Sequence, residues 1–196
     1  MAISGTLKAF LDGQHIPYAA QKHPAVYTAQ EIAAAQHVPG RQLAKSVLLS
    51  TSAGPVLAVL PAIHRVNFGK LKTLLGAKRV SLASEADIKQ AFPDVDVGAM
   101  SVFGQLYRVP VVVDESLAGS DDIVCNAGTH TDTIKVRYRD FARAVKPAVG
   151  AFGMPVPGQS PKASKKKKAA SKTTKKPAPK KKPARKPAKR PTRRKR

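Results

Sequence analysis

The sequence predicts an α/β (α+β) protein, with one compact domain built on a mixed β-sheet flanked by helices, and a disordered basic tail. Helical and strand patterns are interspersed through residues 1–147, and several strand pairs have connections of hairpin length. Such connections favour a mixed sheet over a doubly wound parallel one. The last segment, residues 161–196, holds 19 Lys or Arg and no Asp or Glu.

Capping and turn signals place the elements of the first half. Ser4 can cap a helix, and Thr28-Ala29-Gln30-Glu31 is a capping box in which the hydroxyl and the carboxylate each satisfy a backbone donor. Ser52-Ala53-Gly54 separates two apolar runs and predicts a hairpin. The expected elements are a helix at 4–13, an extended segment at 16–20, a helix at 28–37, and strands at 43–49 and 55–60.

The second half follows the same rules. Asn67 can cap a helix that Gly76 closes, and Ser84 opens another that stops before Pro93. The expected elements are helices at 67–76 and 84–92, a short strand at 80–83, a loop at 94–107, strands at 109–114, 122–126 and 133–136, and a helix at 140–145.

Two segments complete the predicted organisation. Residues 148–160 are rich in Gly and Pro and are expected to be a linker after the domain at 1–147. Residues 161–196 carry almost no apolar bulk and repel themselves, so they cannot build a core. Prolines also interrupt any helix there at every fourth position, at Pro179, Pro183, Pro187 and Pro191.

Composition bounds the class of protein. The domain holds 16 basic and 12 acidic residues before position 161, so most of the net charge of +23 lies in the tail. A single cysteine, Cys125, excludes an internal disulfide framework and fits a reducing compartment. Apolar runs are too short to span a membrane and the N-terminus lacks a signal-peptide pattern. We expect a cytoplasmic monomer with no membrane partner.

Lys45 is the most informative residue. In the expected strand 43–49 it shares a face with Leu43, Val47 and Leu49, which is the more apolar of the two faces. A lysine on such a face either extends its amine past the sheet edge, pairs with a carboxylate, or meets an anionic ligand. Composition alone favours the first alternative.

Familiar catalytic patterns are absent from the sequence. The five histidines lack metal-ligand spacing, and neither a phosphate-binding loop nor a dinucleotide fingerprint nor a nucleophile elbow is present, so we expect no metal and no cofactor. Cys125 is interpreted as a small buried hydrophobic residue. Paired carboxylates such as Asp114-Glu115 are interpreted as part of a solvated face.

Two glycine-containing segments remain. The first, residues 98–104, can turn backbone N–H groups towards a ligand oxygen, although a plain connecting turn is the better explanation of the segment taken alone. The second, residues 126–130, lies between two strands, where a hairpin turn with Gly at positive φ needs no function. Each signal alone is weak.

The order of the motifs is more specific than any one of them. The chain resembles the YbaK-type aminoacyl-tRNA deacylases, which include the editing domain of bacterial prolyl-tRNA synthetases, over roughly residues 3–147. The motifs that carry the resemblance are His23-Pro24, Thr28-Ala29-Gln30-Glu31-Ile32-Ala33, Leu43-Ala44-Lys45-Ser46, Val59-Leu60-Pro61-Ala62, Gly98-Ala99 with Phe103-Gly104, and Asn126-Ala127-Gly128-Thr129-His130.

The resemblance implies hydrolysis of the ester between a wrong amino acid and its tRNA, in a domain with a strongly curved mixed sheet. It implies that Lys45 contacts the tRNA 3′ end or the aminoacyl group, and that the Gly98 loop approaches the ester carbonyl. The implied catalytic residues are Lys45, Gly98, Ala99, Met100 and Ser101. The implied substrate-binding residues are Thr28, Ser46, Val102, Phe103, Gly128, Thr129 and His130.

One position departs from the family pattern. The family loop commonly has proline at the position of Val102, and its absence loosens the loop without removing the backbone donors. We therefore expect a trans-editing deacylase whose tail tethers RNA or DNA non-specifically. The alternative is a nucleoid- or RNA-associated binding protein whose deacylase-fold domain is inactive, with a tail like those of bacterial histone-like proteins.

Overall fold

The computed structural model describes residues 3–156, and the predicted tail at 161–196 lies outside them. In chain order the elements are α1 (Gly5–Gly13), β1 (Tyr18–Lys22), α2 (Ala29–Ala35), β2 (Ala44–Thr51), β3 (Gly54–Pro61), β4 (His64–Val66), α3 (Phe68–Leu75), β5 (Val80–Leu82) and α4 (Glu85–Ala91). They continue with the 3-10 helix η1 (Gly104–Tyr107), β6 (Val111–Asp114), α5 (Glu115–Ala118), β7 (Asp122–Asn126), β8 (Asp132–Arg137), α6 (Tyr138–Val145), β9 (Ala148–Gly150) and β10 (Gly153–Pro155).

The larger sheet is mixed, as the sequence predicts. Its strand order is β5-β2-β3-β6-β9, with β2 antiparallel to β3 and β5, and β6 parallel to β3 and β9. β1, β8 and β7 form a second, antiparallel sheet, and β4 pairs with β10. A parallel bridge between Leu43 and Val124 joins the start of β2 to β7, so the two larger sheets meet at that edge.

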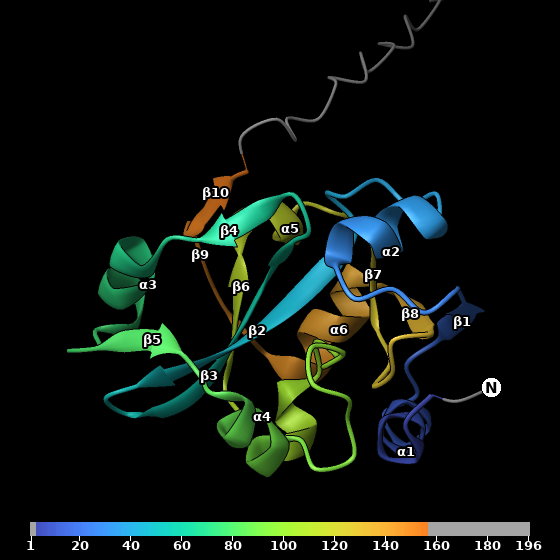
Figure 1. Ribbon diagram of the computed structural model, residues 1–196, viewed down its shortest axis with the longest axis horizontal. Helices are drawn as coiled ribbons and strands as arrows, with labels where there is room; N and C mark the ends of the chain where they lie inside the picture. The colour runs from blue at the N-terminus through green and yellow to red at the C-terminus, as the bar shows by residue number, and fades with distance from the viewer. Residues whose placement is uncertain (1–2, 157–196) are drawn as a thin grey trace, which may run out of the picture. The chain divides into compact units, whose positions relative to one another are not determined.

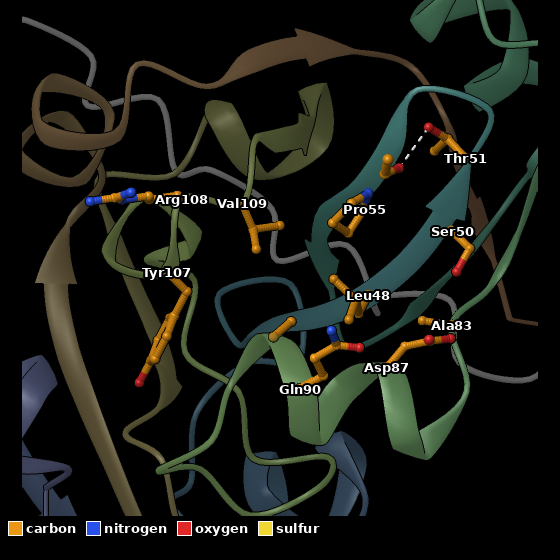
Figure 2. Close-up of a pocket in the computed structure, with 12 residues that line it drawn as sticks. Leu48, Ser50, Thr51, Pro55, Ala83, Asp87, Gln90, Tyr107, Arg108 and Val109 are labelled. Atoms are coloured by element: carbon orange, nitrogen blue, oxygen red, sulfur yellow. Dashed lines mark hydrogen bonds between the residues drawn. The ribbon is translucent and has the colours of Figure 1, made fainter.

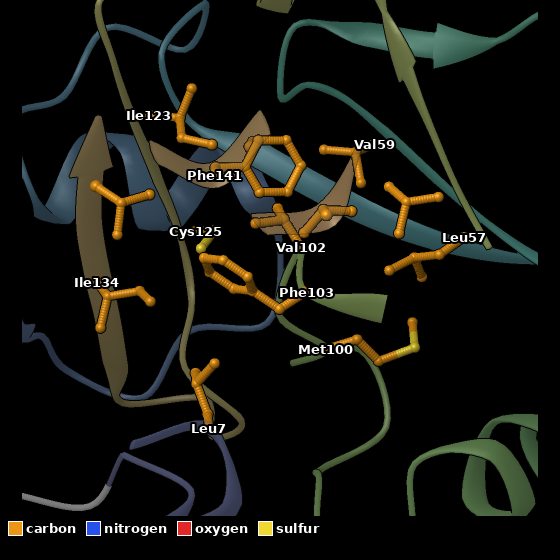
Figure 3. Packing of buried hydrophobic residues seen from close by; sticks show 14 of the residues in the cluster. Leu7, Leu57, Val59, Met100, Val102, Phe103, Ile123, Cys125, Ile134 and Phe141 are labelled. Carbon is orange, nitrogen blue, oxygen red and sulfur yellow. The ribbon is translucent and has the colours of Figure 1, made fainter. Parts of the chain in front are cut away.

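Alternation along the strands divides the core into layers. Leu57 and Val59 of β3 face the main core, which both larger sheets share with α1 and α6 (Figure 3). Ala58 and Leu60 face the opposite side, where they pack with Leu71 of α3. α3 and β5 lie at one end of the domain, and α2 lies with the three-stranded sheet at the other (Figure 1).

The local predictions are confirmed where short-range chemistry decides the structure. Ser4, Asn67 and the two capping boxes at Thr28 and Ser84 all accept the expected backbone hydrogen bonds. Gly76 closes α3 in the left-handed conformation with φ 59°. Across residues 3–156, no helix is long and apolar enough to cross a membrane.

The predicted boundary at residue 147 is too early. Residues 148–155 belong to the domain, because they form β9 and β10 rather than the first part of a linker. Phe152 between these strands is fully buried and packs with the core under α3. One buried aromatic in a Gly- and Pro-rich stretch gives no periodicity, so its long-range packing is not visible in the sequence.

Asp114 is also not solvated, contrary to the interpretation of Asp114-Glu115. Its side chain is buried and accepts hydrogen bonds from Ser116 and from the backbone N–H groups of Phe152 and Gly153. Burial opposes ionisation, but these hydrogen bonds outweigh it and lower the pKa of the carboxyl group. Asp114 therefore fixes the last strands of the domain to β6.

Candidate active site

Lys45 is a half-buried cation on the face of β2 that points away from the main core. Its neighbour Ala44 lies in that core, and Lys45 alternates to the other side. Its Nζ lies 3.4 Å from the carbonyl oxygen of Ala62, to which Gln30 Nε2 also donates at 3.3 Å. None of the ion pairs within residues 3–156 involves Lys45. Burial lowers the pKa of its amine.

Carboxylate pairing, one of the three alternatives for this lysine, is thus not found in the described domain. Both faces of β2 are covered, since Leu48 lies in the main core and Leu49 in the core under α3. The sequence predicts that the face of β2 that carries Lys45 is the more apolar of the two, whereas in the structure both faces pack against a hydrophobic core. A desolvated ammonium with one weak carbonyl partner retains donors for an anion or a polarised carbonyl.

Asn126 lies on β7, the strand that a bridge joins to the start of β2. The bridge between Leu43 and Val124 is parallel, and both of these side chains lie in the small core under α2. Two residues further along each strand come Lys45 and Asn126, which the pleat returns to that same face. Asn126 Nδ2 donates to the carbonyl oxygen of Gly98 at 3.3 Å, so it joins the end of β7 to the glycine loop.

Backbone hydrogen bonds hold the two glycine-containing segments together. Gly128 N donates to the Ala99 oxygen at 3.2 Å, and Asp96 N donates to the Gly128 oxygen at 3.0 Å. Gly98 has φ 90° and Gly128 has φ 103°, conformations that favour glycine. A Cβ on Gly128 would lie 2.9 Å from Cβ of Ser4, so a larger residue at this position would also clash with Ser4.

His130 packs against the glycine loop. Its Nε2 donates to the Val97 carbonyl oxygen at 3.1 Å, and its Cε1 would lie 3.6 Å from a Cβ on Gly98. The ring of Tyr27 also contacts the imidazole of His130, with the ring centroids 4.7 Å apart. The structure thus brings together Gly98, Ala99, Gly128 and His130, four of the residues predicted from the sequence.

The other predicted residues divide into three kinds. Ser46 and Ser101 meet on the opposite face of β2, where the Ser46 hydroxyl donates to the Ser101 carbonyl at 3.0 Å. The side chains of Met100, Val102 and Phe103 are buried in the main core (Figure 3), so a role in the site would fall to their backbone groups. The hydroxyls of Thr28 and Thr129 are engaged in the α2 cap and with Asp132.

Comparison with known proteins decides the family. Residues 23–144 match the aminoacyl-tRNA editing domain. The chain belongs to this family. The prolyl-tRNA editing protein ProX of Acetoanaerobium sticklandii is 28% identical over 144 residues, which cover 70% of this chain and 87% of ProX. Proline–tRNA ligase 1 of Anaeromyxobacter dehalogenans is 32% identical over 118 residues, which cover 58% of this chain but 20% of the ligase.

The fold agrees with this assignment. A solved structure described as a putative trans-editing enzyme for prolyl tRNA synthetase superposes with a TM-score of 0.69 at 19% identity, and covers 79% of this chain and 98% of its own. The family and the fold predicted from the sequence are confirmed, and with the family the class of enzyme, an aminoacyl-tRNA deacylase.

Val102, where the editing family commonly has proline, is held in another way. Its side chain is fully buried in the main core, to which Cys125 also belongs. Burial raises the pKa of Cys125 to about 12, so this thiol is not a nucleophile near neutral pH. The loop is therefore anchored at this position without proline.

Two residues close to the candidate site are not among the candidates that the sequence predicts. Asn126 belongs to a motif visible in the sequence, but its contact with Gly98 joins the end of β7 to a loop 28 residues away. Its Oδ1 is buried and accepts no hydrogen bond within residues 3–156. Tyr27 precedes the capping box, where an aromatic residue is commonly explained as packing on its own helix.

A separate hollow of about 440 Å³ lies further along β2, between β3, α4 and the end of η1 (Figure 2). Leu48, Ala83 and Val109 contribute apolar surface, and Asp87 and Gln90 add polar groups from α4. Lys45 and the Gly98 loop do not line it. The hollow is therefore distinct from the candidate active site.

Proposed function

We propose that this domain hydrolyses mischarged aminoacyl-tRNA as a free-standing editing enzyme. The observation that carries the proposal is Lys45, a half-buried ammonium without a carboxylate partner in the described domain, on a strand whose start is bridged to β7. The names of the relatives, a prolyl-tRNA editing protein and proline–tRNA ligases, support proline tRNA that carries a wrong amino acid as the substrate class. Its place of action would be the cytoplasm, where tRNA is aminoacylated.

The reaction needs little from the protein beyond orientation and charge. An aminoacyl ester is already activated, and the free ribose hydroxyl of the terminal adenosine can assist the attack of water. Lys45 would bind a phosphate or the ester oxygen of the substrate, and the exposed backbone of Gly98 would approach the ester carbonyl. Charge stabilisation and positioning of this kind accelerate acyl transfer without a protein nucleophile.

The need for such an enzyme is physical. A synthetase pocket separates amino acids that differ by one methylene by only about 1–3 kcal/mol, which is too little for accurate translation. A second site that accepts only smaller side chains removes the errors. The proposal thus places the discrimination between amino acids in the surroundings of Gly128 and His130.

The deciding experiment measures deacylation of a panel of tRNAs by the full-length protein. The panel contains proline tRNA charged with proline, alanine, cysteine or serine, and a second tRNA charged with the same amino acids. We expect turnover of one mischarged proline tRNA and sparing of the correctly charged one. Absence of turnover on every member, with a folded protein, would contradict the proposal.

We further propose that residues 161–196 tether nucleic acid to the editing domain. This segment contains 19 basic residues and no acidic or aromatic residue, so binding would be electrostatic and without base stacking. Deletion of 161–196 is expected to lower affinity for tRNA and to flatten its salt dependence, since each neutralised phosphate contributes a log–log slope of about −0.7 to −0.9.

Filter binding to tRNA and to duplex DNA across salt concentrations measures this effect. Equal losses for RNA and DNA would support a general tether, and a loss confined to DNA would favour the nucleoid-associated alternative. An unchanged salt slope after deletion would remove nucleic acid as the partner of the tail.

A further inference from the structure

Tyr27 is an aromatic side chain that the fold leaves exposed at the edge of the candidate active site. It is 73% exposed, more than any other large hydrophobic residue of the described domain. A residue at this position before a helix often packs against the first turn. Here the small core under α2 contains Ile32, with Val26 and Ala29 packed against it, and Tyr27 is not part of it. Packing on its own helix therefore does not account for Tyr27.

The position of Tyr27 is nevertheless fixed. Its backbone N–H donates to Glu31 Oε2 at 3.3 Å, alongside the capping hydrogen bond from Thr28 to the same oxygen. The preceding residue, Val26, donates its N–H to the carbonyl oxygen of His130 at 3.3 Å. The tyrosine ring then lies tilted by 53° against the imidazole of His130. An exposed ring with an ordered backbone on both sides is a preorganised contact surface.

The place of Tyr27 next to His130 indicates which part of the substrate could contact its ring. His130 lies between Tyr27 and the glycine loop, in contact with both. A pocket that sorts amino acids must enclose the side chain, and an aromatic ring with most of its surface in solvent cannot do so. The part of an aminoacyl-tRNA that stays at the surface while the ester enters the site is the terminal nucleoside.

On the basis of the proposed function, we infer that Tyr27 is a positioning residue on which the adenine of the tRNA's 3′-terminal adenosine stacks. Single-stranded bases are commonly bound on aromatic side chains, because every base presents a π-face. Stacking would hold the ribose, and with it the ester, over Gly98 and Lys45. The tyrosine hydroxyl is not needed for this contact.

Kinetics and fluorescence on the full-length protein test the inference. Tyr27→Ala is expected to raise KM for the mischarged tRNA roughly 5- to 150-fold, the loss of one stacked base, and to leave kcat unchanged. Tyr27→Phe should keep the wild-type KM. Uncharged tRNA with 2-aminopurine as its terminal base should be quenched by the wild type and by Tyr27→Phe, and not by Tyr27→Ala.

The controls separate this inference from the proposed function. Phe68, another partly exposed aromatic, lies on α3 at the other end of the domain, and Phe68→Ala should change neither quantity. The fluorescence assay needs no hydrolysis, so it remains decisive if no tRNA is deacylated. Equal quenching by wild type and Tyr27→Ala would overturn the inference, as would a fall in kcat at unchanged KM.

Discussion

Lys45→Ala and Lys45→Met are expected to reduce deacylation at least about 100-fold while the domain stays folded. Loss of one group that stabilises developing charge typically costs a factor of about 10²–10³ in rate. The thermal midpoint should not fall, because the fold gains no ion pair from this lysine within residues 3–156 and bears the cost of its desolvation. The measurement is single-turnover hydrolysis together with thermal unfolding of each variant.

The difference in the free energy of unfolding between the wild type and Lys45→Met should change with pH in a defined direction. Burial holds the pKa of Lys45 below its ordinary value of 10.5, so the unfolded chain binds the proton more tightly than the folded one. Stability of the wild type relative to Lys45→Met should therefore rise with pH between the lowered pKa and about 10.5. Urea unfolding of both proteins across that interval measures it.

An exposed lysine provides the matched control. Lys70 on α3 is exposed to solvent, and Lys70→Ala removes the same charge from a remote position. Its deacylation rate should remain close to that of the wild type. Near-normal turnover by folded Lys45→Met would remove Lys45 from the reaction, and an equal loss in Lys70→Ala would assign the effect to general charge.

Short-range chemistry explains which parts of the fold could be predicted from the sequence. The caps at Thr28 and Ser84 and the hairpin across Ser52-Ala53-Gly54 depend on residues within a few positions of one another. The buried state of Asp114 depends on backbone donors 38 and 39 residues away, which no local pattern encodes. β9 and β10 were missed for the same reason.

In the candidate site, too, sequence patterns predict some residues, whereas contacts between distant segments do not show in the sequence. The strand pattern singles out Lys45 and the glycines single out residues 98–104, and the resemblance to a family implies their roles and those of Gly128 and His130. The contact between Asn126 and the Gly98 carbonyl arises only in the folded domain, because 28 residues separate them in the sequence. Met100 and Phe103 belong to the same motif region, but their side chains lie in the main core.

Gly98→Ala is expected to reduce deacylation about 100-fold with a modest loss of stability. At φ 90° a residue with a Cβ is strained, by about 1–3 kcal/mol for such outliers, so the loop would relax away from this conformation. Space is not the limit, since the new Cβ would lie 3.6 Å from His130 Cε1. A shift of about 1 Å in a positioning element costs about 10²-fold in rate.

Gly54→Ala separates backbone strain from position. Gly54 begins β3 with φ 116° and has open space around its Cβ direction, so alanine there suffers a comparable strain far from the Lys45 face. Both variants should lose similar thermal stability, and only Gly98→Ala should lose activity when both are assayed well below their midpoints. If the two lost activity alike, the glycine loop would act through stability, and the approach of its backbone to the ester would have to be abandoned.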